Sequence, residues 1–311
     1  MDILYGLLES QSLQKSAFYK RRRYFMAITI KTFFDPDTAT FTHIVSDPST
    51  HKAAIIDSVL DYDRYSGRTS TKSADQVIFY IKENNLTVEW ILDTHIHVDH
   101  ITASHYLKEN LGGTIGIGVK IKDVLALWVP IFNIEKDTNL DASQFDHLFK
   151  DGEVFKLGNV DVKVIHTPGH TPACSSYLIE DAIFVGDTLF MPDLGTARTD
   201  FPGGNAAILY DSIKKILSLP DSTRIFMCHD YPPKGRDVTW VTTVKNQKGQ
   251  NILIHDGISK DEYVVVRNKR DEGKAVPKLL LPSIQANLRA GTFGAPEENS
   301  VRYIKIPVDK I

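Results

Sequence analysis

The chain has 311 residues, of which 42% are apolar, and its formal net charge at pH 7 is −3. This length and composition are typical of a folded protein with a large buried core, and the nearly balanced charge disfavours a nucleic-acid-binding protein. No apolar run reaches the roughly 18 residues that a membrane-spanning helix requires, so we expect no membrane segment.

Residues 1–26 differ in composition from the rest of the chain, because they contain a basic run at 20–23 and no repeating apolar pattern. A secretory signal places its basic residues before an apolar stretch of about 7 to 15 residues. Here the apolar stretch that follows the basic run is the start of the first predicted strand. We therefore expect a disordered N-terminal extension over 1–26 and one folded domain over 27–311.

Apolar residues in the rest of the chain alternate between the spacing of strands and the spacing of helices. The predicted strands cover 26–34, 41–47, 52–59, 88–94, 114–118, 160–166, 182–187 and 224–229. The predicted helices cover 73–85, 101–113, 122–133, 205–219 and 260–271. Ser73 is the expected N-cap of the first helix, and Gly112 is the expected end of the second. This alternation predicts a layered α/β architecture, with a loop at 60–73 and long polar loops after Tyr231.

The segment 94–100 concentrates possible metal ligands directly after a predicted buried strand. Its donors are His95, His97, Asp99 and His100. Three imidazoles and a carboxylate this close together incur desolvation and charge-repulsion costs, which a bound cation offsets. The segment therefore predicts a metal site at the end of a strand.

Three further strand ends supply matching donors. A Pro-Gly turn after the strand at 160–166 leads to His170, the strand at 182–187 ends at Asp187, and the last strand ends at His229. Ligands at strand ends that are far apart in the sequence indicate a sheet scaffold whose loops meet at one edge. Five histidines and two aspartates are thus expected to converge.

Both cysteines, Cys174 and Cys228, lie in apolar segments that resemble strands. Buried cysteines in such segments usually remain reduced thiols, and disulfides are rare in the cytosol. We therefore expect no disulfide, no cysteine in the donor set, and a cytoplasmic protein.

Four motifs occur in a fixed order: THIHVDH at 94–100, TPGHT at 167–171, GDTLF at 186–190 and HDY at 229–231. Together they resemble the metallo-β-lactamase superfamily. The resemblance implies an α/β fold, the αββα sandwich of two mixed β-sheets flanked by helices, with metal at one edge. It also implies that 27–311 is a catalytic domain of this type.

The residues around these motifs resemble one branch of the superfamily, the persulfide dioxygenases. The similar segments are SGRTST, HVDHITASHYL, LGGTIGIG, GTARTDFPGG, HDY and PSIQANLRAGT. Glyoxalase II enzymes usually have Gly-Gly after the Asp-His pair, Arg-Phe-Phe after the third motif, and HEY. This chain has Ile101-Thr102, Arg198-Thr199-Asp200 and His229-Asp230-Tyr231 instead. Ala197 and Ala290 replace cysteines of some relatives, which argues against a required thiol at those positions.

The resemblance implies oxidation of glutathione persulfide by O₂ to sulfite and glutathione, a sulfide-detoxifying reaction, at one Fe(II) per chain. It places the catalytic metal on His95, His170 and Asp187, a facial triad that leaves coordination positions open. The remaining donors orient the ligands or hold a second metal: His97, Asp99, His100 and His229. The expected partners are glutathione persulfide and O₂, and a homo-oligomer (dimer or tetramer) is expected.

Four residues are predicted to bind the substrate: Arg198, Tyr231, Asn287 and Arg289. Arg198 is the first candidate, because a planar guanidinium pairs bidentately with a carboxylate. The alternative for Arg198 is an ion pair with Asp200 inside its own loop. Tyr231 follows His229 directly and so lies at the same opening.

Two other functions remain open. One is a glyoxalase II-like thioester hydrolase with two Zn(II) ions held by all seven donors, with Asp187 as the bridging ligand. The other is a sensor without catalytic activity, which the complete ligand set disfavours.

Overall fold

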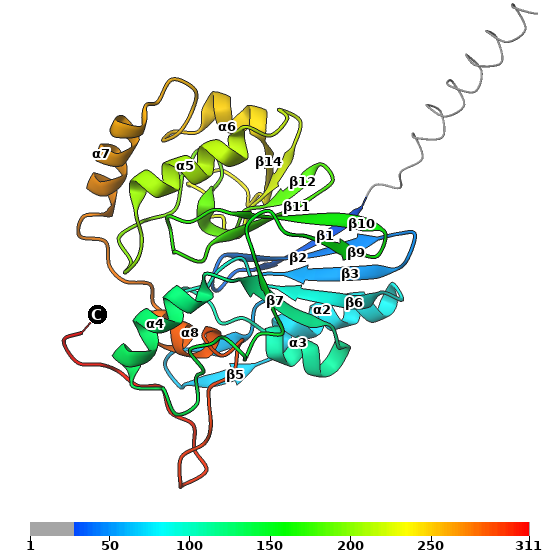
Figure 1. Cartoon of the computed structure of the whole chain (residues 1–311), viewed down its shortest axis with the longest axis vertical. Coiled ribbons are helices and arrows are strands. Elements are labelled where there is room, and N and C mark those ends of the chain that lie inside the picture. Colours follow the sequence, from blue (N-terminus) through cyan, green and yellow to red (C-terminus); the bar gives the residue numbers. More distant parts are fainter. Residues whose placement is uncertain (1–27, 311) are drawn as a thin grey trace, which may run out of the picture.

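The computed structural model describes residues 28–310, which form two sheets packed face to face with helices on both outer faces (Figure 1). This arrangement confirms the predicted αββα sandwich. The extension predicted at 1–26 lies outside the described residues.

The first sheet has six strands in the order β1-β2-β3-β6-β7-β8. Its strands are β1 Thr29–Asp35, β2 Thr40–Asp47, β3 Lys52–Ile56, β6 Thr87–Leu92, β7 Thr114–Gly118 and β8 His147–Phe149. The first three are antiparallel neighbours, whereas β3, β6, β7 and β8 run parallel, so the sheet is mixed. The parallel part places the carboxyl ends of its strands, including the end of β6, at one edge.

The second sheet also has six strands, in the order β14-β13-β12-β11-β10-β9. Its strands are β9 Val154–Leu157, β10 Val160–His166, β11 Ser175–Ile179, β12 Ala182–Phe184, β13 Arg224–Phe226 and β14 Val241–Thr243. Only β12 and β13 are parallel neighbours. Their parallel direction places the segments after β12 and after β13 side by side.

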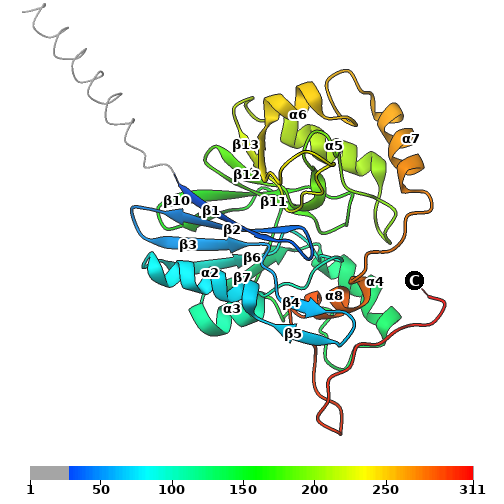
Figure 2. The same cartoon turned by 180° about the vertical axis from the view of Figure 1, so that it is seen from behind.

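Helices cover the outer face of each sheet (Figure 2). The helices are α2 Lys72–Glu83, α3 Ser104–Leu111, α4 Ile121–Phe132, α5 Ala206–Leu217, α6 Val244–Gln250, α7 Lys260–Asp271 and α8 Leu280–Asn287, with a 3₁₀ turn η1 at Gly186–Thr188. The first three and α8 share a core with the first sheet, and α5, α6 and α7 share one with the second. No helix among residues 28–310 is long and apolar enough to cross a membrane.

Burial follows the periodicity of each element. In α2 the buried residues are Ala74, Val77, Ile78 and Ile81, which lie on one face of a helix. All eight residues of β2 are buried, because both faces of this strand are covered. Ile44 belongs to the core shared with the helices, and its neighbour Val45 belongs to the core between the sheets. A third core fills the space between the sheets.

The segment predicted as a loop at 60–73 contains a short hairpin, β4 Asp61–Asp63 with β5 Arg68–Ser70. The predicted Ser73 cap is wrong, since the Ser73 backbone N–H and hydroxyl both donate to Asp61 and the helix begins at Lys72. The Asp61 side chain thus connects the hairpin to the start of α2, a contact that the spacing of residues in the sequence does not predict.

Two further expectations were wrong in detail. The helix predicted at 101–113 begins only at Ser104, because Ile101 bridges to Leu60 and the Thr102 N–H donates to Asn287. The region after Tyr231, predicted as one helix among long loops, contains α6 and α8 in addition to α7.

Candidate metal centre

The seven predicted donors meet at one edge of the sandwich. Asp187 lies at their centre: its carboxylate oxygens are 4.0 Å from His95 Nε2, 3.7 Å from His170 Nε2 and 3.5 Å from His229 Nε2. The first sheet supplies the loop after β6, and the second supplies the segments after β10, β12 and β13. Loops at the ends of rigid strands therefore assemble a site from segments far apart in the sequence.

Several buried polar atoms of this site have no hydrogen-bond partner. Among residues 28–310 there are eight such side-chain atoms, and six belong to the site: His95 Nε2, His97 Nδ1, His100 Nε2, His170 Nε2, Asp187 Oδ1 and His229 Nε2. A buried polar atom without a partner costs about 1–3 kcal/mol. Six of them directed at one another fit a bound cation, so the residues present suit a metal ion.

The seven donors fall into two groups that share no residue. Within each group the atoms lie no more than 4.8 Å apart: His95, His170 and Asp187 in one, and His97, Asp99, His100 and His229 in the other. The first group has the composition of a facial triad, with two imidazoles and one carboxylate. The second can hold an ion of its own.

Asp99 is the only carboxylate of the second group, and its neighbours already contact it. His100 Nδ1 lies 3.3 Å from Oδ1, and the Tyr231 hydroxyl donates to Oδ2 at 3.2 Å. His229 Nε2 also lies 3.2 Å from Oδ2, although the contact is an ion pair without hydrogen-bond alignment. Asp99 is thus stabilised by protein groups.

Each triad histidine is oriented through its other ring nitrogen. His170 Nδ1 donates to the Arg198 carbonyl oxygen at 2.8 Å, and His95 Nδ1 lies 3.0 Å from the Thr94 hydroxyl. Such contacts fix the tautomer and direct the Nε2 lone pair into the site.

Asp57 is a functional residue that sequence reasoning missed. Its Oδ1 accepts from the Thr94 N–H at 2.8 Å and lies 3.1 Å from His97 Nε2, so it positions the whole loop after β6. A sequence signal exists, because Asp57 directly follows the apolar strand β3, and Asp187 likewise lies shortly after the apolar strand β12.

The electrostatics of the site favour neutral imidazoles at His95 and His97. Burial, followed by the neighbouring histidines, lowers the pKa of His95 and of His97 well below the ordinary value. At His229 burial would lower the pKa, but the charges of Asp99 and Asp187 outweigh burial and raise it. Burial would raise the pKa of Asp99, but the charge of His229 and the hydrogen bond from His100 hold it well below its usual range. Neutral imidazoles and a carboxylate anion are the forms that bind metal ions.

Both cysteines are free and buried, as predicted. No cysteine is expected in the donor set, yet Cys228 Sγ lies within 4.8 Å of donor atoms of Asp187 and His229. Burial raises the pKa of the Cys228 thiol well above its ordinary value. Without a bound cation, Cys228 is therefore a protonated thiol beside the site.

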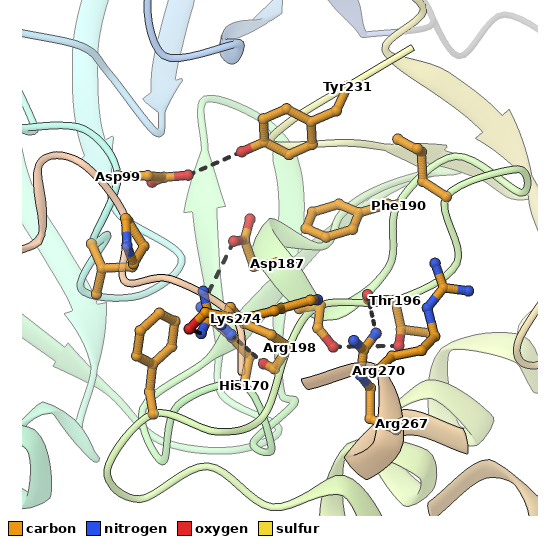
Figure 3. Close-up of a pocket in the computed structure, with 15 residues that line it drawn as sticks. Asp99, His170, Asp187, Phe190, Thr196, Arg198, Tyr231, Arg267, Arg270 and Lys274 are labelled. Atoms are coloured by element: carbon orange, nitrogen blue, oxygen red, sulfur yellow. Dashed lines mark hydrogen bonds and ion pairs between the residues drawn. The ribbon is translucent and has the colours of Figure 1, made fainter. Parts of the chain in front are cut away.

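A cavity of about 310 Å³, called here the main pocket, opens beside the metal donors (Figure 3). Asp99, His170 and Asp187 form its floor. Apolar side chains line it: Phe190, Leu194 and Phe201. Cationic side chains from α7 and the segment after it complete the wall: Arg267, Arg270 and Lys274. The pocket suits an anionic molecule with an apolar portion near the metal.

Arg198 lines the main pocket, but its guanidinium is already paired. Nε and Nη2 each donate to Asp200 at 2.6 Å, and Nη1 donates to the Ala275 carbonyl at 2.8 Å. This is the loop ion pair that the sequence offered as the alternative. Tyr231 does lie at the pocket, with its ring stacked on His229.

Asn287 and Arg289 do not line the main pocket, which corrects their predicted placement. Asn287 is 1% exposed, and its amide nitrogen donates to the carbonyls of His97 and His100. Arg289 is buried and donates to Asp137 and Thr138. Asn287 therefore holds the backbone of the metal loop, and Arg289 is bonded to residues outside the main pocket.

Arg270 and Lys274 were not predicted as pocket residues. Arg270 makes no side-chain hydrogen bond or ion pair within residues 28–310, whereas Lys274 lies 3.2 Å from Asp271. No sequence signal links α7 to the metal motifs, because about thirty residues separate it from the last of them.

Comparisons with known proteins agree with this architecture. A family model described as the metallo-beta-lactamase superfamily matches residues 38–229. The chain is 51% identical over 284 residues to a Dictyostelium discoideum protein named Glyoxylase B2, covering 90% of this chain and 97% of that protein.

Similarity extends to proteins named for persulfide oxidation. The chain is 29% identical over 267 residues to the Homo sapiens protein named Persulfide dioxygenase ETHE1, mitochondrial, covering 85% of this chain and 89% of that protein. The crystal structure of ETHE1 from Myxococcus xanthus superposes with a TM-score of 0.69 at 30% identity, covering 85% of this chain and 100% of that chain. With its αββα sandwich and metal-binding edge, this chain belongs to the metallo-beta-lactamase superfamily.

Proposed function

We propose that the protein is a glutathione-dependent persulfide dioxygenase that uses one Fe(II), held by His95, His170 and Asp187. The observation that carries the proposal is the division of the donors. The unpartnered Nε2 atoms of His95 and His170 lie 4.0 and 3.7 Å from Asp187 Oδ2, while Asp99 of the other group is contacted by His100, His229 and Tyr231.

A facial triad is the ligand set that non-haem iron enzymes use, because it leaves neighbouring positions open for O₂ and substrate. A ferrous ion there would pass electrons to O₂ from the outer sulfur of the persulfide, which loses four electrons as it is oxidised to sulfite. The chain's own residues hold the substrate and exclude water: Phe190 and Phe201 shield the reacting end, and cationic groups bind the distant end. Similarity to proteins named persulfide dioxygenase supports this assignment.

Arg270 and Lys274 are the best candidates to bind a glutathione carboxylate. Both line the main pocket, and Arg270 has no partner within residues 28–310. Arg198 is a weaker candidate, because binding a substrate would require it to leave Asp200. Its proposed role is to shape the loop that carries Thr199.

Oxygen uptake tests the proposed reaction. Persulfide oxidation needs a metal that can pass electrons to O₂, whereas redox-inert zinc suffices for hydrolysis. The Fe(II)-loaded protein should consume O₂ with glutathione persulfide and release sulfite, and the Zn(II)-loaded protein should not. Efficient cleavage of S-lactoylglutathione without oxygen uptake by the Fe(II) form would replace this function with the hydrolase.

Replacing Arg270 by glutamine should raise KM for glutathione persulfide about tenfold and leave kcat nearly unchanged, because a charged hydrogen bond contributes about 1.5–3 kcal/mol and exposure reduces it. Steady-state oxygen uptake measures both constants. Lys269→Gln is the matched control, since Lys269 lies on the same turn of α7 but does not line the pocket. Equal KM values for the two variants would exclude Arg270 from substrate binding.

The dinuclear zinc hydrolase remains the second candidate, because His97, His100 and His229 also present unpartnered nitrogens. A relative named Glyoxylase B2 supports the same candidate. In that case Asp187 would contact both ions, as its distances to His170 and His229 permit.

A further inference from the structure

One peptide group connects the metal centre with α7. Its carbonyl oxygen belongs to Arg198 and accepts from His170 Nδ1 at 2.8 Å. Its N–H belongs to Thr199 and donates to Asp271 Oδ2 at 2.9 Å. The two hydrogen bonds therefore lie on opposite sides of the same amide, with a ligand imidazole at one end and a buried carboxylate at the other.

We propose that Asp271 is a positioning residue for the metal centre, which acts on His170 through the peptide group between Arg198 and Thr199. A carboxylate that accepts from the N–H of an amide polarises that amide and makes its oxygen a stronger acceptor. The stronger bond to Nδ1–H increases the electron density at Nε2, as a directly bonded carboxylate does in many metal sites.

Asp271 is held in place for this role. It is 5% exposed, and its oxygens accept from Arg267 and from Lys274 Nζ at 3.2 Å. Arg267 is itself buried and donates through Nη1 to the Thr196 carbonyl at 2.9 Å. Figure 3 shows Arg267 and Arg270 on the same helix beside the pocket. The segment 196–199 is thus hydrogen-bonded to α7 at both ends.

Helix α7 carries both a cationic side chain of the main pocket, Arg270, and the carboxylate proposed to support His170, Asp271. Arg270 and Asp271 are consecutive residues at the end of α7. A ligand anion that contacts Arg270 therefore binds one residue from the carboxylate that supports the metal ligand. The inference depends on the proposal that His170 holds metal, and it is independent of the reaction that the metal performs.

Asp271→Asn tests the proposal, because asparagine keeps the shape of the side chain and removes its charge. The probe is Zn²⁺ alone, titrated against a chelating competitor. We expect affinity to fall about tenfold or more, the range found for groups that orient metal ligands. Asp200→Asn is the matched control: Asp200 pairs with the Arg198 side chain in the same loop but does not contact the shared peptide group.

A spectroscopic readout separates the proposed role from a loss of stability. In ¹⁵N-labelled Zn²⁺ protein, the His170 Nδ1–H resonance should move upfield in Asp271→Asn, because its hydrogen bond weakens, and stay in place in Asp200→Asn. A folded Asp271→Asn protein with unchanged affinity and an unchanged resonance would overturn the proposal.

The wild-type chain gives a second test in case Asp271→Asn does not fold. Zn²⁺ binding makes the His170 imidazole a stronger donor, so the Thr199 amide proton should move downfield when Zn²⁺ is added. The Gly204 amide, which donates to Phe201 in the same segment, is the control. A Thr199 resonance that moves no more than Gly204 would overturn the proposal. Failure of the wild-type protein to bind Zn²⁺ at all would instead overturn the metal assignment itself.

Discussion

Alanine in place of His95, His170 or Asp187 should abolish high-affinity iron binding and persulfide oxidation. Each substitution removes one of three ligands, and two remaining ligands cannot hold the ion in a defined geometry. The site has no spare carboxylate for the triad, because Asp99 is contacted by His100, His229 and Tyr231. Elemental analysis of anaerobically purified protein measures the iron per chain, with one expected in the unsubstituted protein.

His229→Ala is the matched control for this experiment. His229 is buried in the same site, but it lies nearer to Asp99, at 3.2 Å, than to Asp187, at 3.5 Å. The variant should keep most of its iron and turn over slowly. A fully active preparation with two zinc ions per chain, or loss of all metal from His229→Ala, would contradict the mononuclear assignment.

Asn287→Ala should lower the free energy of unfolding by about 3–5 kcal/mol, although Asn287 contacts no donor atom. Its side chain makes three hydrogen bonds to the backbone of the metal loop: to the carbonyls of His97 and His100, and from the N–H of Thr102. Each buried group left without a partner costs about 1–3 kcal/mol. Urea unfolding measures the loss, and metal affinity should fall with it.

Asn110→Ala provides the comparison, because Asn110 is exposed and its amide donates only to the Tyr106 carbonyl of its own helix. Such a surface change usually alters stability by less than about 0.5 kcal/mol. If the two variants unfold at the same urea concentration, the three hydrogen bonds between Asn287 and the metal loop do not contribute to stability.

The sequence predicted the fold and the donors because both depend on local patterns. Asp187 and His229 follow short apolar strands, and strand ends in one sheet meet at an edge whatever the exact register. The αββα arrangement required the resemblance as well, since the alternation of strands and helices alone fits several layered folds.

The lining of the pocket could not be predicted in this way. Arg270 lies on α7, which shares a core with α5 and the second sheet, and this tertiary packing places it at the site. Asn287 carries a conspicuous polar group next to Arg289, yet its partners lie about 190 residues away and are backbone atoms. Partners of this kind follow from tertiary packing, which a pattern of residue types does not encode.

The division of the donors between the two sheets has a mechanical consequence. The loop after β6 belongs to the first sheet, whereas His170, Asp187 and His229 belong to the second, and an apolar core fills the space between the sheets. A cation bound by both is a cross-link between the layers. It would add about 4 kcal/mol to the free energy of unfolding when free metal is a thousandfold above Kd and binds only the folded state. Chelation would therefore loosen the sandwich at this edge as well as remove the reactive centre.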